Sequence, residues 1–258
     1  MRLRRLLFAS ALLLAPARPA AAQLALEARV TLASAYVWRG LTLVNRPVIQ
    51  PEATLSIGPV ALGFWSNIEP ARYTGANDLS VLAGRRAPGV TELDPFLEVA
   101  RELGGATVTA GASAYLYTHA AGYETEPNTA ELYGRLEFSG AVPLQLAGYY
   151  DLHSVRGLYL EAGLERPLPG WRRLRVGALA GAGLGEAAGP ETWYFERDGL
   201  THVELSARLP LALGPVQLSP FAHVTLGLDP ATRAVAPERM RGAKLWGGLS
   251  VTWPVPED

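Results

Sequence analysis

The sequence contains no cysteine, and this absence removes several classes of function. Without cysteine there is no disulfide framework, no thiolate nucleophile and no cysteine-based metal site. The four histidines, His119, His153, His202 and His223, do not form a cluster with the spacing of metal ligands. The sequence therefore predicts neither a metal nor any other cofactor.

Long apolar runs are missing as well. The apolar stretch at residues 6–15 is shorter than the roughly 20 residues of a membrane-spanning helix. No later stretch reaches that length without a charge or a proline. With a basic start before it and small residues at positions 20–22, residues 1–22 match a secretory signal peptide, and an uncleaved anchor is the alternative. We expect a mature chain of residues 23–258, which can cross a membrane only as strands.

The chain also lacks an excess of positive charge. It carries 23 basic and 24 acidic residues, and removal of residues 1–22 with their four arginines leaves a formal net charge of −5. A protein that binds nucleic acid normally has a basic surface. The charge balance therefore argues against a nucleic-acid partner.

What the sequence does contain is alternation of apolar and polar residues from end to end. In residues 26–32 the even positions are apolar and the odd ones polar, and residues 244–253 repeat the pattern. A period of two is typical of a strand whose two faces have different surroundings. The pattern predicts twelve strands, at residues 24–38, 47–58, 60–69, 93–103, 105–118, 128–140, 142–153, 157–167, 172–184, 199–212, 214–227 and 242–253.

The joints between these segments alternate in length. Tight turns rich in glycine and proline, such as Gly58 with Pro59, are followed by longer polar connections. Short periplasmic turns and longer outer loops are typical of outer-membrane barrels. If the N-terminus is periplasmic, the outer connections are residues 39–46, 70–92, 119–127, 154–156, 185–198 and 228–241.

The expected fold class is all-β, a 12-stranded antiparallel transmembrane β-barrel. Residues 78–84 form a doubtful short strand, which we assign to the second outer loop. With a further strand inside residues 185–198, it would give the alternative of 14 strands. A soluble β-sandwich or barrel would show the same alternation with its apolar face inward, but strand length and even spacing favour the membrane barrel.

Two stretches carry a resemblance to a known family. Residues 34–41 read Ser-Ala-Tyr-Val-Trp-Arg-Gly-Leu and residues 46–51 read Arg-Pro-Val-Ile-Gln-Pro. Together they resemble the opening signature of the TorF family of porins, a group of exported proteobacterial proteins. The resemblance covers residues 34–67 well and the rest of the mature chain loosely. It implies an outer-membrane barrel with pore function, and it carries over no catalytic or binding residue.

The last predicted strand contains Trp246, Gly248, Val251 and Trp253. This spacing resembles the C-terminal signal that the barrel assembly machinery reads, although five residues follow Trp253. We therefore expect export to the outer membrane of a Gram-negative bacterium after cleavage of the signal peptide. The expected partners are outer-membrane lipid, the barrel assembly machinery and small polar solutes.

The polar strand faces place charged side chains in the lumen. The candidate pore-lining residues are Glu27, Arg29, Glu52, Glu98, Glu131, Arg135, Glu137, Asp151, Glu161, Arg173, Arg175, Glu204, Arg208 and Lys244. With Asp94, Glu102 and Glu165, which are expected on the same faces, the sum is −5. A low-dielectric wall focuses such a field, so this excess predicts a small diffusion pore with a weak preference for cations. The alternative is that Glu–Arg pairs bridge the lumen and close it.

Aromatic side chains share these inward faces. They are Tyr115, Tyr117, Tyr133, Tyr149 and Tyr159, together with Trp65 and Trp246. We expect them to fill space in a narrow barrel, and a path for a sugar or nucleoside is the alternative.

Two other functions are alternatives for a barrel of this kind. A barrel-embedded lipid hydrolase needs a serine activated by a histidine on the lipid-facing side. Ser113 and His153 are expected on inward faces, and there is no Gly-x-Ser-x-Gly motif, so we expect no enzyme. The other function is a plugged structural or adhesive barrel whose outer loops bind a partner. Residues 193–195, Trp-Tyr-Phe, would then be exposed, although a loop that folds back over the mouth explains them equally well.

Overall fold

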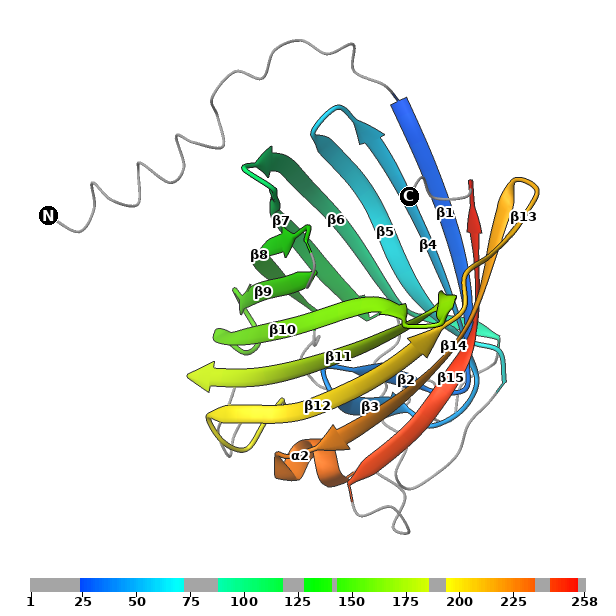
Figure 1. The fold of residues 1–258 in the computed structure, drawn as a ribbon. Helices are drawn as coiled ribbons and strands as arrows, with labels where there is room; N and C mark the ends of the chain where they lie inside the picture. Colours follow the sequence, from blue (N-terminus) through cyan, green and yellow to red (C-terminus); the bar gives the residue numbers. More distant parts are fainter. Residues whose placement is uncertain are drawn as a thin grey trace, which may run out of the picture.

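A closed ring of antiparallel strands forms the molecule (Figure 1). The computed structural model describes residues 24–71, 88–117, 128–140, 143–185, 194–234 and 242–254. The predicted signal peptide, the doubtful strand at residues 78–84 and His119 lie outside these residues.

Twelve strands make up the ring, which confirms the predicted strand number. They are β1 (Leu24–Ala33), β4 (Val48–Ile57), β5 (Val60–Glu69), β6 (Gly89–Leu103), β7 (Ala106–Tyr117), β8 (Thr129–Phe138), β9 (Leu144–Asp151), β10 (Gly157–Leu168), β11 (Trp171–Gly185), β12 (Gly199–Arg208), β14 (Val216–Gly227) and β15 (Ala243–Trp253). The ring closes because β1 pairs with both β4 and β15, and β12 pairs with β14. The short strand β13 (Leu211–Leu213) pairs with the beginning of β14.

The outer surface of the barrel is apolar. Leu62, Leu97, Leu132 and Leu205 alternate with inward residues along their strands, and Leu205 is 62% exposed. In water such exposure would be costly, but toward lipid tails it is favourable. An apolar exterior around a polar interior is the architecture of an outer-membrane β-barrel.

The two ends of the barrel differ. The short connections at residues 58–59, 104–105, 169–170 and 209–215 share one end, which we name the turn end. β1 begins and β15 finishes there as well (Figure 1). The strand ends that flank the longer connections lie at the opposite end, named the loop end. There, helix α2 (Pro230–Ala234) follows β14, and no helix among the described residues is long and apolar enough to cross a bilayer.

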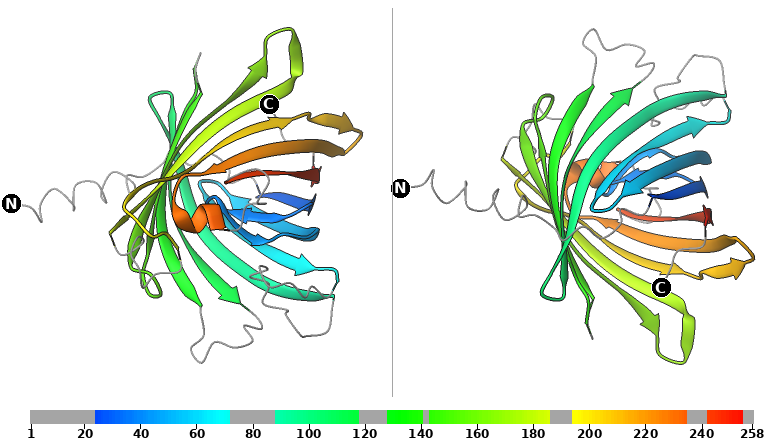
Figure 2. Two further views of the ribbon diagram at one scale, coloured as in Figure 1. Left: turned by 90° about the horizontal axis from the view of Figure 1, so that it is seen from below. Right: turned by 90° about the horizontal axis from the view of Figure 1, so that it is seen from above.

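The first connection departs from the prediction. β1 ends at Ala33 rather than at residue 38, and residues 34–47 form a hairpin of β2 (Tyr36–Trp38) and β3 (Leu41–Val44). This hairpin lies within the barrel, so the prediction that residues 39–46 form an outer loop is wrong (Figures 1 and 2). Residues 35–38 are all apolar or aromatic and follow β1 without a glycine or proline. The sequence therefore does not mark where the chain leaves the barrel wall.

Candidate functional site

The inward hairpin, residues 34–47, is named the hairpin plug. Its two-residue turn consists of Arg39 and Gly40, which both have positive φ angles of 49° and 80°. Such a turn matches the right-handed twist of the flanking strands. For an arginine, the left-handed conformation costs about 1–2 kcal/mol. Contacts made elsewhere must therefore hold Arg39 in this conformation.

Arg39 makes those contacts at the centre of the barrel. Its Nη1 and Nη2 atoms donate hydrogen bonds of 2.7 and 2.6 Å to the two carboxylate oxygens of Glu131. The two side chains are only 4% and 1% exposed. The guanidinium carbon also lies 4.3, 4.6 and 4.5 Å from the ring centroids of Trp38, Tyr149 and Tyr159. Burial lowers the pKa of Arg39, but the hydrogen bonds and charge of Glu131, together with Tyr115 and Tyr194, raise it by more in total, so Arg39 stays charged.

The hairpin plug reaches across the lumen. Glu131, Tyr149 and Tyr159 belong to β8, β9 and β10, which lie opposite β1 and β4 in the ring. At the turn, a Cβ atom on Gly40 would come within 2.5 Å of Cγ of His202, which lies on β12. The tip of the plug is therefore fitted closely against the far wall.

A second layer fills the loop end beside the plug. Tyr194 and Phe195 are fully buried, with the Tyr194 ring 5.1 Å from Trp38 and the Phe195 ring 5.8 Å from Tyr159. The sequence left open whether residues 193–195 are exposed or fold back over the mouth. Tyr194 and Phe195 fold inward. Trp193 lies outside the described residues.

Asp229 holds this layer together. Its carboxylate accepts hydrogen bonds from the backbone amides of Glu196, Arg197 and Ala231, at 3.0, 3.1 and 2.9 Å. It thus ties the segment after Phe195 to the first turn of α2. Figure 2 shows α2 inside the ring of strands.

The turn-end half of the lumen is polar and partly open. Three clusters of predicted pore-lining charges line it. They are Arg29 with Glu27 and Glu52 (2.9 and 3.5 Å), Arg135 with Glu98 (2.6 Å), and Glu165 with Arg175 and Arg208 (both 2.7 Å). We name this region the turn-end vestibule. Its charged side chains are 17% to 41% exposed, so water reaches them.

Asp151, another predicted pore-lining residue, has a different setting. It is buried at the loop end, where Oδ1 accepts hydrogen bonds from the amides of His153 and Val155 at 3.0 and 2.8 Å. Thr129 donates to Oδ2 at 2.8 Å. Asp151 therefore anchors the connection after β9. His153 is exposed in that connection, so its predicted place on an inward strand face is wrong.

The remaining predicted pore-lining residues also have defined settings. Four hold a hydrogen bond with another side chain: Glu137 with Gln145 (3.1 Å), Glu161 with Tyr159 (3.0 Å), Glu204 with His223 (2.7 Å), and Lys244 with Asn45. Arg173 is exposed near the start of β11. Most of these charges thus have partners, and their role in a conducting path stays a prediction.

Three of the inward tyrosines form a row, and Trp65 contacts the plug. The ring centroids of Tyr133 and Tyr149 lie 5.9 Å apart, and those of Tyr149 and Tyr159 lie 6.1 Å apart. Trp65 packs against Tyr36 of the plug at 5.2 Å. These rings therefore contact one another and the plug.

Sequence reasoning missed Arg39 as an interior residue. An arginine in a turn between two strands is usually solvated, and nothing near position 39 indicates its partner 92 residues away. The one feature of the sequence that indicates a hairpin here is the pair Arg39-Gly40. It matches a two-residue hairpin turn, although asparagine or aspartate before glycine is more typical.

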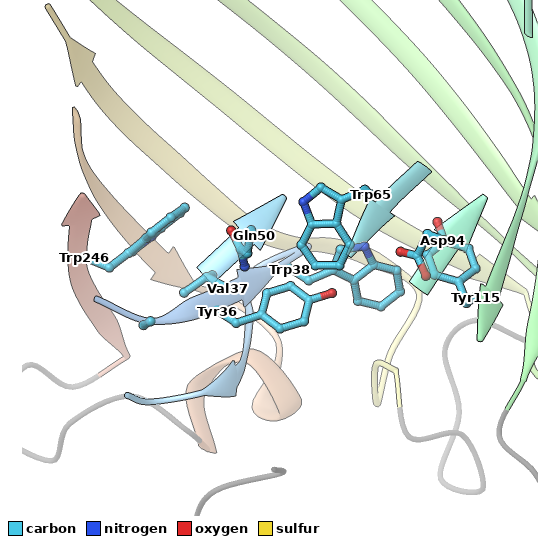
Figure 3. A pocket seen from close by; sticks show the side chains of 9 residues that line it. Tyr36, Val37, Trp38, Gln50, Trp65, Asp94, Tyr115 and Trp246 are labelled. Carbon is cyan, nitrogen blue, oxygen red and sulfur yellow. The ribbon is translucent and has the colours of Figure 1, made fainter. Parts of the chain in front are cut away.

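A cavity of about 320 Å³ lies between the plug and the barrel wall (Figure 3). Trp38 and Tyr36 line it from β2, Trp65 and Asp94 from β5 and β6, and Trp246 from β15. Aromatic faces and a single carboxylate side chain thus surround it.

Comparison with known proteins gives little beyond the fold. No family model matches the chain, and no curated protein matches it. The chain is similar to the crystal structure of an outer membrane channel from Pseudomonas putida F1, with 12% identity over 92% of this chain and 96% of that one, and a TM-score of 0.46. It is also similar to outer membrane phospholipase A from Escherichia coli, with 11% identity, coverage of 88% and 92%, and a TM-score of 0.45. These likenesses are too weak to transfer a function.

The resemblance to the TorF porins accordingly stays a prediction. The chain's own geometry shows an outer-membrane type of β-barrel, with a polar vestibule at one end and a buried hairpin plug at the other.

Proposed function

We propose that the chain is a channel of the outer membrane of a Gram-negative bacterium, related to the TorF porins, which admits small polar solutes past the hairpin plug. The proposal includes the cleaved signal peptide, insertion by the barrel assembly machinery and a weak preference for cations. It includes no enzymatic activity.

The observation that carries the proposal is the contrast between the two halves of the lumen. A purely structural barrel has no need of exposed charges on its inner wall, because apolar side chains would fill that space at lower desolvation cost. Here Arg29, Arg135 and Arg208 remain 36% to 41% exposed within the turn-end vestibule. Water and solutes therefore have access to half the barrel.

In this proposal the hairpin plug controls the passage of solute through the loop-end half of the lumen. The described contacts between the hairpin tip and β8–β10 centre on Arg39, whose only hydrogen-bonding side-chain partner among the described residues is Glu131. We infer that the plug also has an undocked arrangement, since a segment held by one such contact can switch between two discrete positions. Conductance would then follow the docking of the plug.

Single-channel recording tests this function. The refolded mature chain is inserted into a planar bilayer under a salt gradient. We expect discrete conductance steps and a small reversal potential in the direction of cation selectivity. A barrel that inserts without any steps would contradict the channel. Release of fatty acid from the bilayer lipid by such a silent barrel would support a hydrolase instead.

A further inference from the structure

The cavity beside the hairpin plug contains an unsatisfied buried carboxylate. Asp94 is 8% exposed, and its Oδ1 atom has no hydrogen-bond partner among the described residues. A buried carboxylate oxygen without a donor is costly. The site therefore favours a guest that brings a donor.

The charges around Asp94 favour a cationic guest. Glu92, two residues earlier on β6, is a second buried acidic side chain on the same wall. The buried guanidinium of Arg39 is already bound to both carboxylate oxygens of Glu131. No basic residue lines the cavity.

Aromatic rings stand next to this carboxylate. Trp65 on β5 is the direct cross-strand partner of Asp94 on β6, so their Cβ atoms are neighbours on the same face. Figure 3 shows Trp65, Trp38 and Tyr115 grouped around Asp94. Tryptophan is the strongest aromatic partner for a cation. The structure already contains one example, since the Arg39 guanidinium lies 4.3 Å from the Trp38 ring centroid.

We propose that this cavity binds a small organic cation with a primary ammonium group. The ammonium N–H groups donate to Asp94 Oδ1, and the attached carbon chain lies against Trp65 and Trp38. A volume of about 320 Å³ is at the small end of ligand pockets, which suits a short alkylammonium ion. The inference rests on the proposed channel, because the cavity lies in its lumen, and it names a class of solute for that channel.

Other guests fit the cavity less well. Among the described residues, no three acidic or histidine side chains gather as a metal site requires. A sugar needs several polar partners, whereas Asp94 and Gln50 are the only non-aromatic polar side chains of the lining. A neutral alcohol of the same length lacks the charge that the two carboxylates favour.

Equilibrium binding to the refolded mature chain in detergent micelles tests the inference, with n-butylammonium chloride as the probe. Calorimetry gives the affinity, and tryptophan fluorescence reports contact with the rings. We expect n-butylammonium to bind, tetramethylammonium to bind more weakly because it has no N–H group, and 1-butanol not to bind measurably. Binding of 1-butanol or D-glucose as tight as that of n-butylammonium would overturn the inference.

Two variants test whether n-butylammonium binds in this cavity. Asp94→Asn should weaken n-butylammonium binding about tenfold or more, because it removes a charged hydrogen-bond acceptor. Trp65→Leu should weaken it about threefold or more through loss of the cation–π contact. The control is Glu102→Gln, the same chemical change at an exposed turn-end position of the same strand, and it should leave binding unchanged. Undiminished binding by folded Asp94→Asn would refute the site.

The comparison of ligands on the unmodified chain remains decisive even where a variant does not fold. Failure of this inference is also distinct from failure of the channel. Conductance steps without n-butylammonium binding would refute the cation site alone, whereas binding by a barrel that never conducts would refute the channel.

Discussion

Replacement of Arg39 by asparagine should open the barrel. Asparagine accepts positive φ more readily than most residues, so the turn of the hairpin plug is kept. The variant loses both hydrogen bonds with Glu131 and the contacts with three aromatic rings. The change thus acts on docking of the plug and leaves its hairpin form intact.

The expected size of the effect follows from burial. The carboxylate of Glu131 is 1% exposed, and without Arg39 the one side-chain hydrogen bond left to it among the described residues is the 2.8 Å bond from the Tyr115 hydroxyl. Removal of one partner from a buried ion pair costs about 3–5 kcal/mol. Undocking of the plug lets water reach Glu131 and relieves that cost. The ratio of undocked to docked plug should therefore rise by about two to four orders of magnitude.

Two measurements check this expectation. Single-channel recording should show larger or more frequent openings for Arg39→Asn than for the unmodified chain. Because the sequence has no cysteine, a thiol introduced by Thr42→Cys is unique, and it lies on β3 where Thr42 is buried. A water-soluble maleimide should label it slowly when Arg39 is present and quickly in the Arg39→Asn background.

Arg29→Asn is the matched control. It removes the same charge from the lumen, but Arg29 is 39% exposed in the turn-end vestibule, where an ion pair contributes about 0–1 kcal/mol. It should change selectivity slightly and leave labelling of Thr42→Cys slow. If Arg39→Asn matched this control in both measurements, the plug would not be held by Arg39.

Three further predictions concern the wall, the lumen charges and the loop end. Leu136→Arg should impair folding into bilayers by about 2–4 kcal/mol in a urea titration, because Leu136 faces outward, whereas Arg135→Leu should cost less because position 135 faces the lumen. Change of four inward carboxylates to amides, at Glu98, Glu137, Glu161 and Glu204, should move the reversal potential toward zero. The shift should be larger at 0.01 M salt, where the screening length is about 30 Å, than at 1 M, where it is about 3 Å. Asp229→Ala should speed tryptic cleavage after Arg197, since it frees that backbone segment from its acceptor, and unchanged cleavage would contradict the role of Asp229.

The barrel wall could be predicted from the sequence because its signal is local. Each wall strand alternates with period two, and glycine or proline marks the tight turns. The strand predicted at residues 157–167 is β10, Gly157–Leu168, and the one predicted at residues 60–69 is β5, Val60–Glu69. A closed barrel with one apolar face leaves little freedom of register, since a slip by one residue would exchange the two faces.

The hairpin plug could not be predicted in this way, because its position depends on distant contacts. Residues 35–38 are apolar or aromatic and follow β1 without a glycine or proline, so Tyr36 and Trp38 look like a continuation of β1. What holds it inside is the carboxylate of Glu131 on β8, and its tip lies close against His202 on β12. Nothing in the sequence around these two residues distinguishes them from the other polar residues expected on inward faces.

The pairing of the lumen charges changes what their sum means for selectivity. A total of −5 treats each charge as acting alone, but the structure groups most of them. On the β10–β12 side, Glu165 is shared by Arg175 and Arg208, a local excess of one positive charge. On the β1–β4 side, Arg29 is shared by Glu27 and Glu52, a local excess of one negative charge.

These two clusters lie in the same half of the barrel, and between them Glu98 and Arg135 cancel. At physiological ionic strength the screening length of about 8 Å lets each cluster act only on its own side of the vestibule. A solute cation then favours the Glu52 side and an anion the Glu165 side, so both can enter. Strong discrimination can arise only farther in, beside the plug, where Asp94 and Glu92 are buried and screening is weak. Selectivity of this barrel should therefore depend on the buried wall around the plug more than on the many charges of the open half.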